Sequence, residues 1–188
     1  MKLSICIPYF SGAGHTAQLA QEIAKGCGQG CAHLIDVTRI QNDDWHALDA
    51  CHAIVFGSPT YMGSTAASFD SFLEDAAADR WPNPGWTDKF AAGFTVASHP
   101  SGDKLVALQR MQTYAAQMGM VWVGQTSVGA PVFPDYDGLN WDGSWIGLMA
   151  TSSRDKKEML RPEDRQTAND FGLRIANAAR RWNNLSAD

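Results

Sequence analysis

The chain has 188 residues, of which 45% are hydrophobic and 19% charged, and its formal net charge is −5. This length predicts one domain over residues 1–188 with a substantial buried core. The mild acidity and the lack of basic runs argue against nucleic acid and anionic membranes as partners. The apolar run that follows Met1-Lys2 is only as long as a strand, so we expect neither a signal peptide nor a transmembrane helix.

Apolar runs alternate with helical patterns along the first half of the chain. Strands are predicted at residues 3–9, 32–36 and 53–57, where residues 58–64 interrupt the third strand. Helices are predicted at about 14–25, which a glycine-rich segment ends, and at about 66–77. A short helical turn at 45–48 is expected to be capped by Asp43 or Asp44.

The second half continues the alternation and then loses it. A fourth strand is predicted at 90–97, a helix at about 103–118 and a fifth strand at 120–123. This helix carries residues at core spacing, namely Leu105, Leu108, Met111, Ala115 and Met118. Turn-forming residues dominate 129–161, and loops this long are usually functional or oligomeric. The run at 145–149 is a candidate to complete the fifth strand, and a last helix covers about 161–182. The whole pattern predicts an α/β fold with a parallel sheet covered on both faces.

Four cysteines, Cys6, Cys27, Cys31 and Cys51, lie in the first third of the chain. Their spacing forms no Cys-x-x-Cys pair and no zinc-binding pattern, so we expect free thiols and no metal site. Cys6 stands in a predicted strand and is expected to be buried. Free thiols are typical of a reducing compartment, which predicts a cytoplasmic location.

The first strand ends in the loop Ser11-Gly12-Ala13-Gly14-His15-Thr16, which opens directly into a helix. Such a turn gathers backbone N–H groups and the positive end of a helix dipole around one point, which suits a phosphate. The loop has no lysine and no Gly-Lys pair, which favours a monophosphate over a nucleoside triphosphate. Two alternatives stay open: the glycine pattern with Ala17 matches a variant dinucleotide fingerprint, and Ser11 and Thr16 suit an ordinary capped turn.

Three loops, at residues 11–16, 58–64 and 97–103, each follow the carboxyl end of a predicted strand. In an open parallel sheet these ends meet at one edge, where ligands bind at the switch point of strand order. All three are rich in Ser, Thr, Gly and Pro, which expose backbone donors without blocking a flat ligand. Together they predict one site for a flat ring that carries a single phosphate.

These loops resemble those of the flavodoxin-like FMN proteins. The motifs are Ser11-x-x-Gly14-His15-Thr16, Gly57-Ser58-Pro59-Thr60-Tyr61-Met62-Gly63 and Ala97-Ser98-His99-Pro100-Ser101-Gly102. The most similar branch is that of the WrbA-type NAD(P)H:quinone oxidoreductases and NADPH-dependent FMN reductases, and the likeness covers nearly the whole chain in element order. It implies a doubly wound, five-stranded parallel sheet of order 2-1-3-4-5, an irregular insertion around the fifth strand, and a homodimer or homotetramer.

The resemblance also implies roles for residues. The FMN phosphate would be held by Ser11, Gly12, Ala13, Gly14, His15 and Thr16. The ribityl chain and one edge of the isoalloxazine would lie along Pro59, Thr60, Tyr61, Met62 and Gly63. The other side of the ring would be closed by residues 97–103, among them Ala97, Ser98, His99, Gly102 and Asp103. Trp81 falls where the quinone reductases place an aromatic near the substrate.

The chain departs from this branch at two places near the expected flavin. The third loop carries His99, Pro100 and Ser101 where the branch is rich in glycine. The segment Gln117-Met118-Gly119 lacks a histidine that the branch places there. The resemblance therefore supports the cofactor better than the substrate.

The activity that the resemblance implies is that of an FMN-dependent oxidoreductase. A hydride would pass from NAD(P)H, the co-substrate, through flavin N5 to a small quinone-like acceptor in ping-pong order. His99 and Tyr61 are the candidate catalytic residues, and Trp81 is the candidate substrate contact. Each also has an alternative role without function in the site: His99 as an exposed loop histidine, and Tyr61 and Trp81 as aromatics of the core or of an interface.

Two other functions are compatible with the same fold. One is a flavodoxin-like electron carrier without its own NAD(P)H turnover, and the other is a protein that binds no flavin and acts through its interfaces. Carriers are usually strongly acidic around the flavin, whereas Asp103 is the one carboxylate at the margin of the three loops. This difference favours the enzyme.

Overall fold

The structure is a computed structural model that describes residues 2–81, 85–153, 155 and 157–185. A parallel sheet forms its centre, in the order β2-β1-β3-β5-β6. These strands are β1 (Ile5–Tyr9), β2 (Ala32–Asp36), β3 (Ala53–Tyr61), β5 (Phe90–Ala97) and β6 (Val121–Trp122). Because β4 is only a short extra strand, this is the predicted order 2-1-3-4-5, which is confirmed.

The fifth position of the sheet is shared by two short strands. β6 pairs with Phe90 and Ala91 at the start of β5, and β7 (Leu148–Thr151) pairs with residues 94–97 at its end. The predicted insertion therefore lies inside the fifth strand, and the 145–149 run completes that strand from Leu148 onward. Gly147, just before β7, passes so close to β5 that an added Cβ would lie 2.5 Å from the carbonyl oxygen of Gly93.

Residues 58–64 do not interrupt the third strand as the sequence predicts. β3 continues to Tyr61 and turns back through Met62 and Gly63 into β4 (Ser64–Thr65), an antiparallel hairpin. Both turn residues have positive φ, +49° and +80°, as a tight two-residue hairpin requires. Pro59 is tolerated because β1 has already ended opposite Gly57, so among the described strands Pro59 itself pairs with β5 alone.

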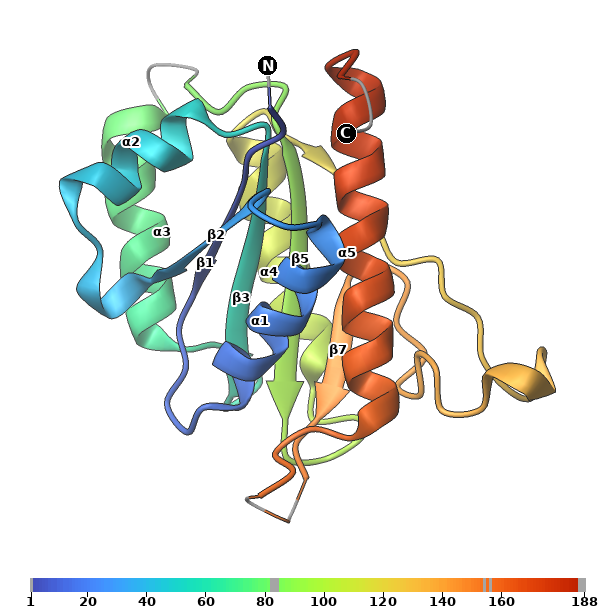
Figure 1. Ribbon diagram of the computed structural model, residues 1–188. Coiled ribbons are helices and arrows are strands. Elements are labelled where there is room, and N and C mark those ends of the chain that lie inside the picture. The colour runs from blue at the N-terminus through green and yellow to red at the C-terminus, as the bar shows by residue number, and fades with distance from the viewer. Residues whose placement is uncertain (1, 82–84, 154, 156, 186–188) are drawn as a thin grey trace.

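Helices cover both faces of the sheet (Figure 1). One face carries α1 (His15–Cys27) and α5 (Pro162–Trp182), and the other carries α3 (Ala67–Arg80) and α4 (Lys104–Gln117), with α2 (Asn42–Ala50) beside α3. Two further single turns of 3-10 helix lie at Val37–Arg39 and Pro134–Tyr136. Within the described residues, no helix has both the length and the apolar composition to cross a bilayer.

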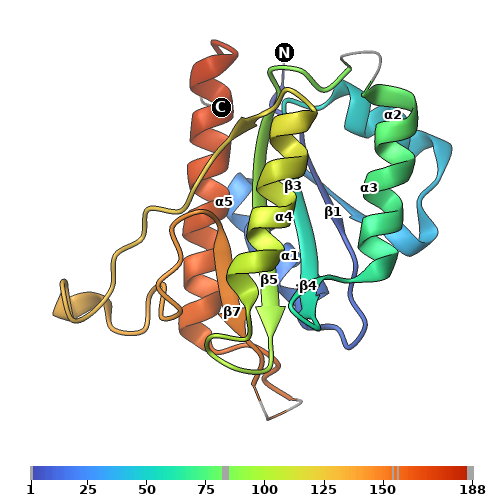
Figure 2. The same cartoon turned by 180° about the vertical axis from the view of Figure 1, so that it is seen from behind.

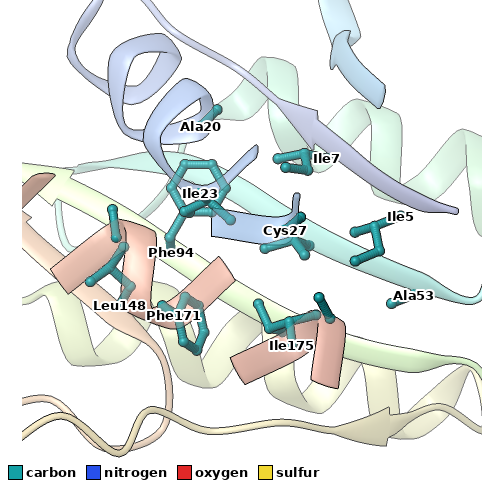
Figure 3. Close-up of a cluster of buried hydrophobic side chains, with 14 of the residues drawn as sticks. Ile5, Ile7, Ala20, Ile23, Cys27, Ala53, Phe94, Leu148, Phe171 and Ile175 are labelled. Atoms are coloured by element: carbon teal, nitrogen blue, oxygen red, sulfur yellow. The ribbon is translucent and has the colours of Figure 1, made fainter. Parts of the chain in front are cut away.

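The core has two halves, one on each side of the sheet. Ile5 and Ile7 of β1 face α1 and α5, where they pack with Ile23 and Phe171 (Figure 3). Cys6, between them, is buried on the opposite face, as predicted. Such burial on both faces is typical of a central parallel strand.

Two local predictions differ from the structure. α2 is longer than the predicted turn because Gln41, not an aspartate, caps it; Asp44 stands at the third helical position and accepts a hydrogen bond from the Gln41 N–H at 2.9 Å. In α4, core spacing would also include Leu105, yet this side chain is 49% exposed. Leu105 lies in the first turn beside the insertion, where it lines a surface pocket.

Candidate functional site

The first loop presents backbone donors at the start of α1. Gly14, with φ of +92°, is the N-cap, and Ser11 Oγ accepts hydrogen bonds from the N–H groups of Gly14 and Ala17, both at 3.1 Å. In the described part of the chain, no acceptor faces the N–H groups of Gly12, Ala13, His15 and Thr16. Unpaired N–H groups at a helix N-terminus form an anion-binding site, so this loop can hold a phosphate.

Two side chains lie close over the first loop. A Cβ added to Gly12 would be 2.5 Å from the Tyr61 hydroxyl oxygen, and one added to Gly14 would be 2.6 Å from Cε of Met159. Tyr61 also packs edge-on against Phe10, with ring centroids 6.4 Å apart. A side chain at either glycine would have to displace the end of Tyr61 or Met159, and the positive φ of Gly14 favours glycine there in addition.

The second loop is fixed by a buried hydroxyl. Ser58 Oγ accepts a hydrogen bond from the Ala66 N–H and donates one to the Pro59 carbonyl, both at 2.9 Å. The hydroxyls of Thr60 and Thr95 lie 2.7 Å apart and join β3 to β5. Ser58 thus has a structural role, and it holds Thr60 and Tyr61 at the carboxyl edge of the sheet.

The third loop folds tightly back on itself. Gly102 and Asp103 both have φ of +53°, and a Cβ on Gly102 would lie 2.6 Å from the Ala97 Cβ. The Ser152 N–H donates to the Ala97 carbonyl oxygen at 2.9 Å, so the segment after β7 lies beside this loop. His99 is exposed.

The three loops meet around one open pocket of about 170 Å³ at the carboxyl edge of the sheet. Its lining comes from the first loop (Gly12, Ala13, His15, Thr16), the second (Pro59, Thr60, Tyr61) and the third (Ala97, Ser98), together with Val96 and Ser152. The remaining predicted positions stand on the same loops without lining the pocket: Ser11, Gly14, Met62, Gly63, His99, Gly102 and Asp103. The structure therefore brings the three predicted loops together, and about half of the predicted positions on each loop line the pocket.

Trp81 does not join this group. α3 runs from the carboxyl edge back to the amino edge, and Trp81 follows its last residue there, 65% exposed (Figure 2). It lines a different pocket, between α3 and α4. Within one copy of the chain, Trp81 and the three loops lie at opposite edges of the sheet.

Ser152 is a pocket residue that the sequence analysis did not single out. It belongs to a fourth hydroxyl-rich segment, Thr151-Ser152-Ser153, which begins at the last residue of β7. The signal was the same as for the other loops: polar residues directly after a strand. This signal could not be recognised in the sequence because β7 is short and lies inside the irregular tract at 129–161.

A buried ion pair holds the third loop against the insertion. Lys104, the first residue of α4, is fully buried, and its Nζ lies 2.5 Å from Asp142 Oδ2 and 2.9 Å from Thr151 Oγ1. Burial lowers the pKa of Lys104 from its usual 10.5, although the bond to Asp142 opposes this shift. A buried charge needs such partners, so the insertion is tied to the start of α4.

The pocket is electrically neutral apart from what His15 contributes. Among the described residues that line it, none is Asp, Glu, Lys or Arg. In the described part of the chain, no three His, Cys, Asp or Glu side chains are grouped so that they could hold a metal ion. The donors offered to a ligand are therefore backbone N–H groups and the hydroxyls of Ser, Thr and Tyr.

Known proteins are similar to this chain in sequence and in fold. Residues 6–97 match the family model described as a flavodoxin domain. Flavodoxin FldP of Pseudomonas aeruginosa is 34% identical over 175 residues, which cover 90% of this chain and 93% of that protein. The crystal structure of a flavodoxin, WrbA-like protein from Agrobacterium tumefaciens is 35% identical, superposes with a TM-score of 0.75, and covers 96% of this chain and 99% of its own.

More distant relatives carry enzyme names. An NAD(P)H dehydrogenase (quinone) of Geobacter metallireducens is 25% identical over 65% of this chain and 71% of its own length. The order of the sheet, the two helical layers and the three loops define an α/β protein of the flavodoxin-like class. The chain belongs to the flavodoxin family.

Proposed function

We propose that this protein binds FMN at the pocket between the three loops and acts as an NAD(P)H-dependent oxidoreductase on a small quinone-like acceptor. The unpaired N–H groups of the first loop support the cofactor, because they suit one phosphate and come without a lysine that a triphosphate would call for. The bound flavin would supply hydride transfer from the nucleotide to the acceptor.

The chain's own residues would bind and orient the cofactor. Gly12, Ala13, His15 and Thr16 would donate to the phosphate, with Ser11 holding their loop in shape. Thr60 and Tyr61 on one side and Ala97 and Ser98 on the other would flank the rest of the molecule. Tyr61, which lines this pocket, and His99, an exposed residue that follows the lining residue Ser98, remain the candidate proton donors to an acceptor.

The observation that carries the enzymatic proposal is the neutral, open pocket. A carboxylate beside the flavin would repel an anionic nucleotide, and no described residue that lines the pocket is acidic. NAD(P)H and the acceptor would use the same exposed face in turn, which is a ping-pong order. The relatives named NAD(P)H dehydrogenase (quinone) support this reading.

An electron carrier is the second candidate. The relative of higher identity and fuller coverage is named a flavodoxin, and this favours a carrier that exchanges electrons with another protein. Carrier and enzyme would share the cofactor site and differ in whether NAD(P)H reduces it directly.

Two measurements separate these functions. Purified protein should be yellow or take up FMN with quenching of flavin fluorescence; the absence of both overturns the cofactor proposal. Initial rates of NADPH or NADH oxidation with benzoquinone should then give parallel double-reciprocal lines, as a ping-pong order requires. FMN uptake without turnover of either nucleotide would identify the carrier.

A further inference from the structure

A second pocket, of about 280 Å³, lies between α3 and α4. These helices stand side by side on one face of the sheet (Figure 2). The lining comes from α3 and the residue after it (Leu73, Glu74, Ala77, Trp81) and from α4 and the residue after it (Arg110, Tyr114, Gln117, Met118). This pocket shares no lining residue with the one at the carboxyl edge.

The floor of this pocket is apolar except for one group. Leu73 and Met118 are buried, and the Tyr114 ring packs edge-on against Phe56 with centroids 5.8 Å apart. Tyr114 is only 5% exposed, yet among the described residues its hydroxyl has no hydrogen-bond partner. An unpaired buried hydroxyl destabilises the folded protein, and a ligand oxygen bound there would remove that cost.

A cation lies over the ring of Tyr114. The Arg110 guanidinium is 5.9 Å from the centroid of the Tyr114 ring, and its Nε is 3.4 Å from Asp70 Oδ1. The Thr65 hydroxyl already donates to the Asp70 carboxylate, its Oγ1 lying 2.8 and 2.9 Å from the two oxygens. Arginine has five N–H donors, so Arg110 can bind an anion with the fork of its guanidinium while Nε stays near Asp70.

The residues at the rim of this pocket limit the shape and the charge of a ligand. Trp81 offers a largely exposed aromatic face, which suits a planar ring. Glu74, also on the rim, would repel a ligand that carries more than one negative charge. The Arg110 side chain is 35% exposed, so we expect its guanidinium to turn about Nε and admit a ligand oxygen to the Tyr114 hydroxyl.

We propose that this pocket binds a small aromatic monocarboxylate. The ring lies against Leu73, Met118 and Trp81, and the carboxylate lies between the Tyr114 hydroxyl and the Arg110 guanidinium. Because the two pockets share no residue, binding here does not displace a ligand at the carboxyl edge. The site is thus independent of the proposed FMN function.

Titration of the full-length, FMN-treated protein with benzoate tests this proposal. In ¹H–¹⁵N spectra, we expect saturable shifts of the Trp81 indole N–H and the Arg110 Nε–H. Tyr114→Phe should weaken benzoate binding about tenfold, the size of one lost hydrogen bond to a charged group. Arg110→Gln should weaken benzoate but leave benzyl alcohol, a neutral probe with the same ring, unchanged. Tyr136→Phe, at an exposed tyrosine of the insertion, is the matched control and should bind benzoate as the wild type does.

Three results would overturn the proposal. The first is no saturable shift at Trp81 and Arg110, and the second is shifts confined to residues of the carboxyl-edge pocket, such as Thr60 and Tyr61. The third is benzoate affinity that Tyr114→Phe and Arg110→Gln leave unchanged. Acetate serves as the probe without a ring, and equal affinity for acetate and benzoate would contradict the aromatic requirement. FMN uptake is measured separately, so its failure leaves the benzoate result intact.

Discussion

Ser11 shows how one hydroxyl can prepare a loop for an anion without binding the anion itself. Its Oγ accepts hydrogen bonds from the N–H groups of Gly14 and Ala17, while in the described part of the chain the N–H groups of Gly12, Ala13 and their neighbours in the first loop have no partner. The serine therefore orders the donors that face the pocket. Its contribution to binding is indirect, through the conformation of the loop.

Ser11→Ala should accordingly weaken FMN binding about tenfold, since two backbone N–H groups lose their acceptor and the loop loses its fixed shape. Titration of flavin fluorescence with the variant measures this. Ser71→Ala, at an exposed serine of α3 outside the three loops, is the control and should bind FMN as the wild type does. Equal affinity of Ser11→Ala and wild type would mean that the backbone alone maintains the cradle.

Tyr114 is a residue whose polar group lowers stability. Its hydroxyl is buried and, among the described residues, unpaired, and burial raises its pKa above the usual 10, so it stays protonated. Tyr114→Phe keeps the ring packing against Phe56 and removes the unpaired group. We expect the free energy of unfolding without ligand to rise by about 1 kcal/mol, measured by urea titration. A fall of that size would reveal a partner for the hydroxyl.

At the scale of elements, the insertion between β6 and β7 is more than a surface loop. Its residue Asp142 forms an ion pair with Lys104 at the start of α4. The hydroxyl of Thr151 in β7 hydrogen-bonds to both side chains. All these groups lie directly behind the third loop. The arrangement fixes where that loop leaves the sheet, and thus one wall of the carboxyl-edge pocket.

Asp142→Ala should cost about 3–5 kcal/mol in the free energy of unfolding, because Lys104 would be left charged and buried without its partner. Chemical denaturation measures this cost. The double variant Lys104→Met/Asp142→Leu, which replaces the pair with apolar groups, should recover most of the loss. If the double variant is as unstable as Asp142→Ala, packing of the insertion outweighs the charge pair.

Regular elements were predictable from the sequence because each carries its own local signal. β5 and β2 have the predicted bounds, since their apolar runs end at turn residues. The hairpin after Pro59 was not predictable in this way, because a proline usually ends a strand and only the early end of β1 permits it here. Predicting that requires knowing the neighbour's length, which is tertiary information.

The same contrast holds for the site. Three loops could be placed together from the topology of parallel sheets alone, and the structure brings them to one pocket. Ser152 escaped prediction because its strand is a fragment, and Trp81 was placed by likeness, whereas the direction of α3 carries it to the other edge. The side chains that actually face a pocket depend on loop conformation, which local sequence patterns do not determine.

At the scale of the whole molecule, acid stability depends on carboxylates that join separate elements. Asp49 of α2 accepts hydrogen bonds from Arg80 Nε at 2.6 Å and from the Trp86 indole N–H at 2.9 Å, and it joins α2 to α3 and to the segment before β5. Burial alone would raise the pKa of Asp49, but the bonds from Arg80 and Trp86 outweigh it and hold the pKa below the usual 3.8.

A carboxylate with a lowered folded-state pKa adds stability above its unfolded pKa, and this contribution is lost as the pH falls through the folded value. Asp49→Asn should therefore lower the Tm at pH 6, and the difference from wild type should shrink as the pH falls below 3.8 toward the lower folded pKa. Thermal unfolding followed by circular dichroism across this range measures the difference. Asp75→Asn, at an exposed aspartate of α3, is the control and should track the wild type. A Tm difference that stays constant through the acid range would mean that the Asn side chain disturbs packing around Trp86, and that the charge of Asp49 contributes nothing.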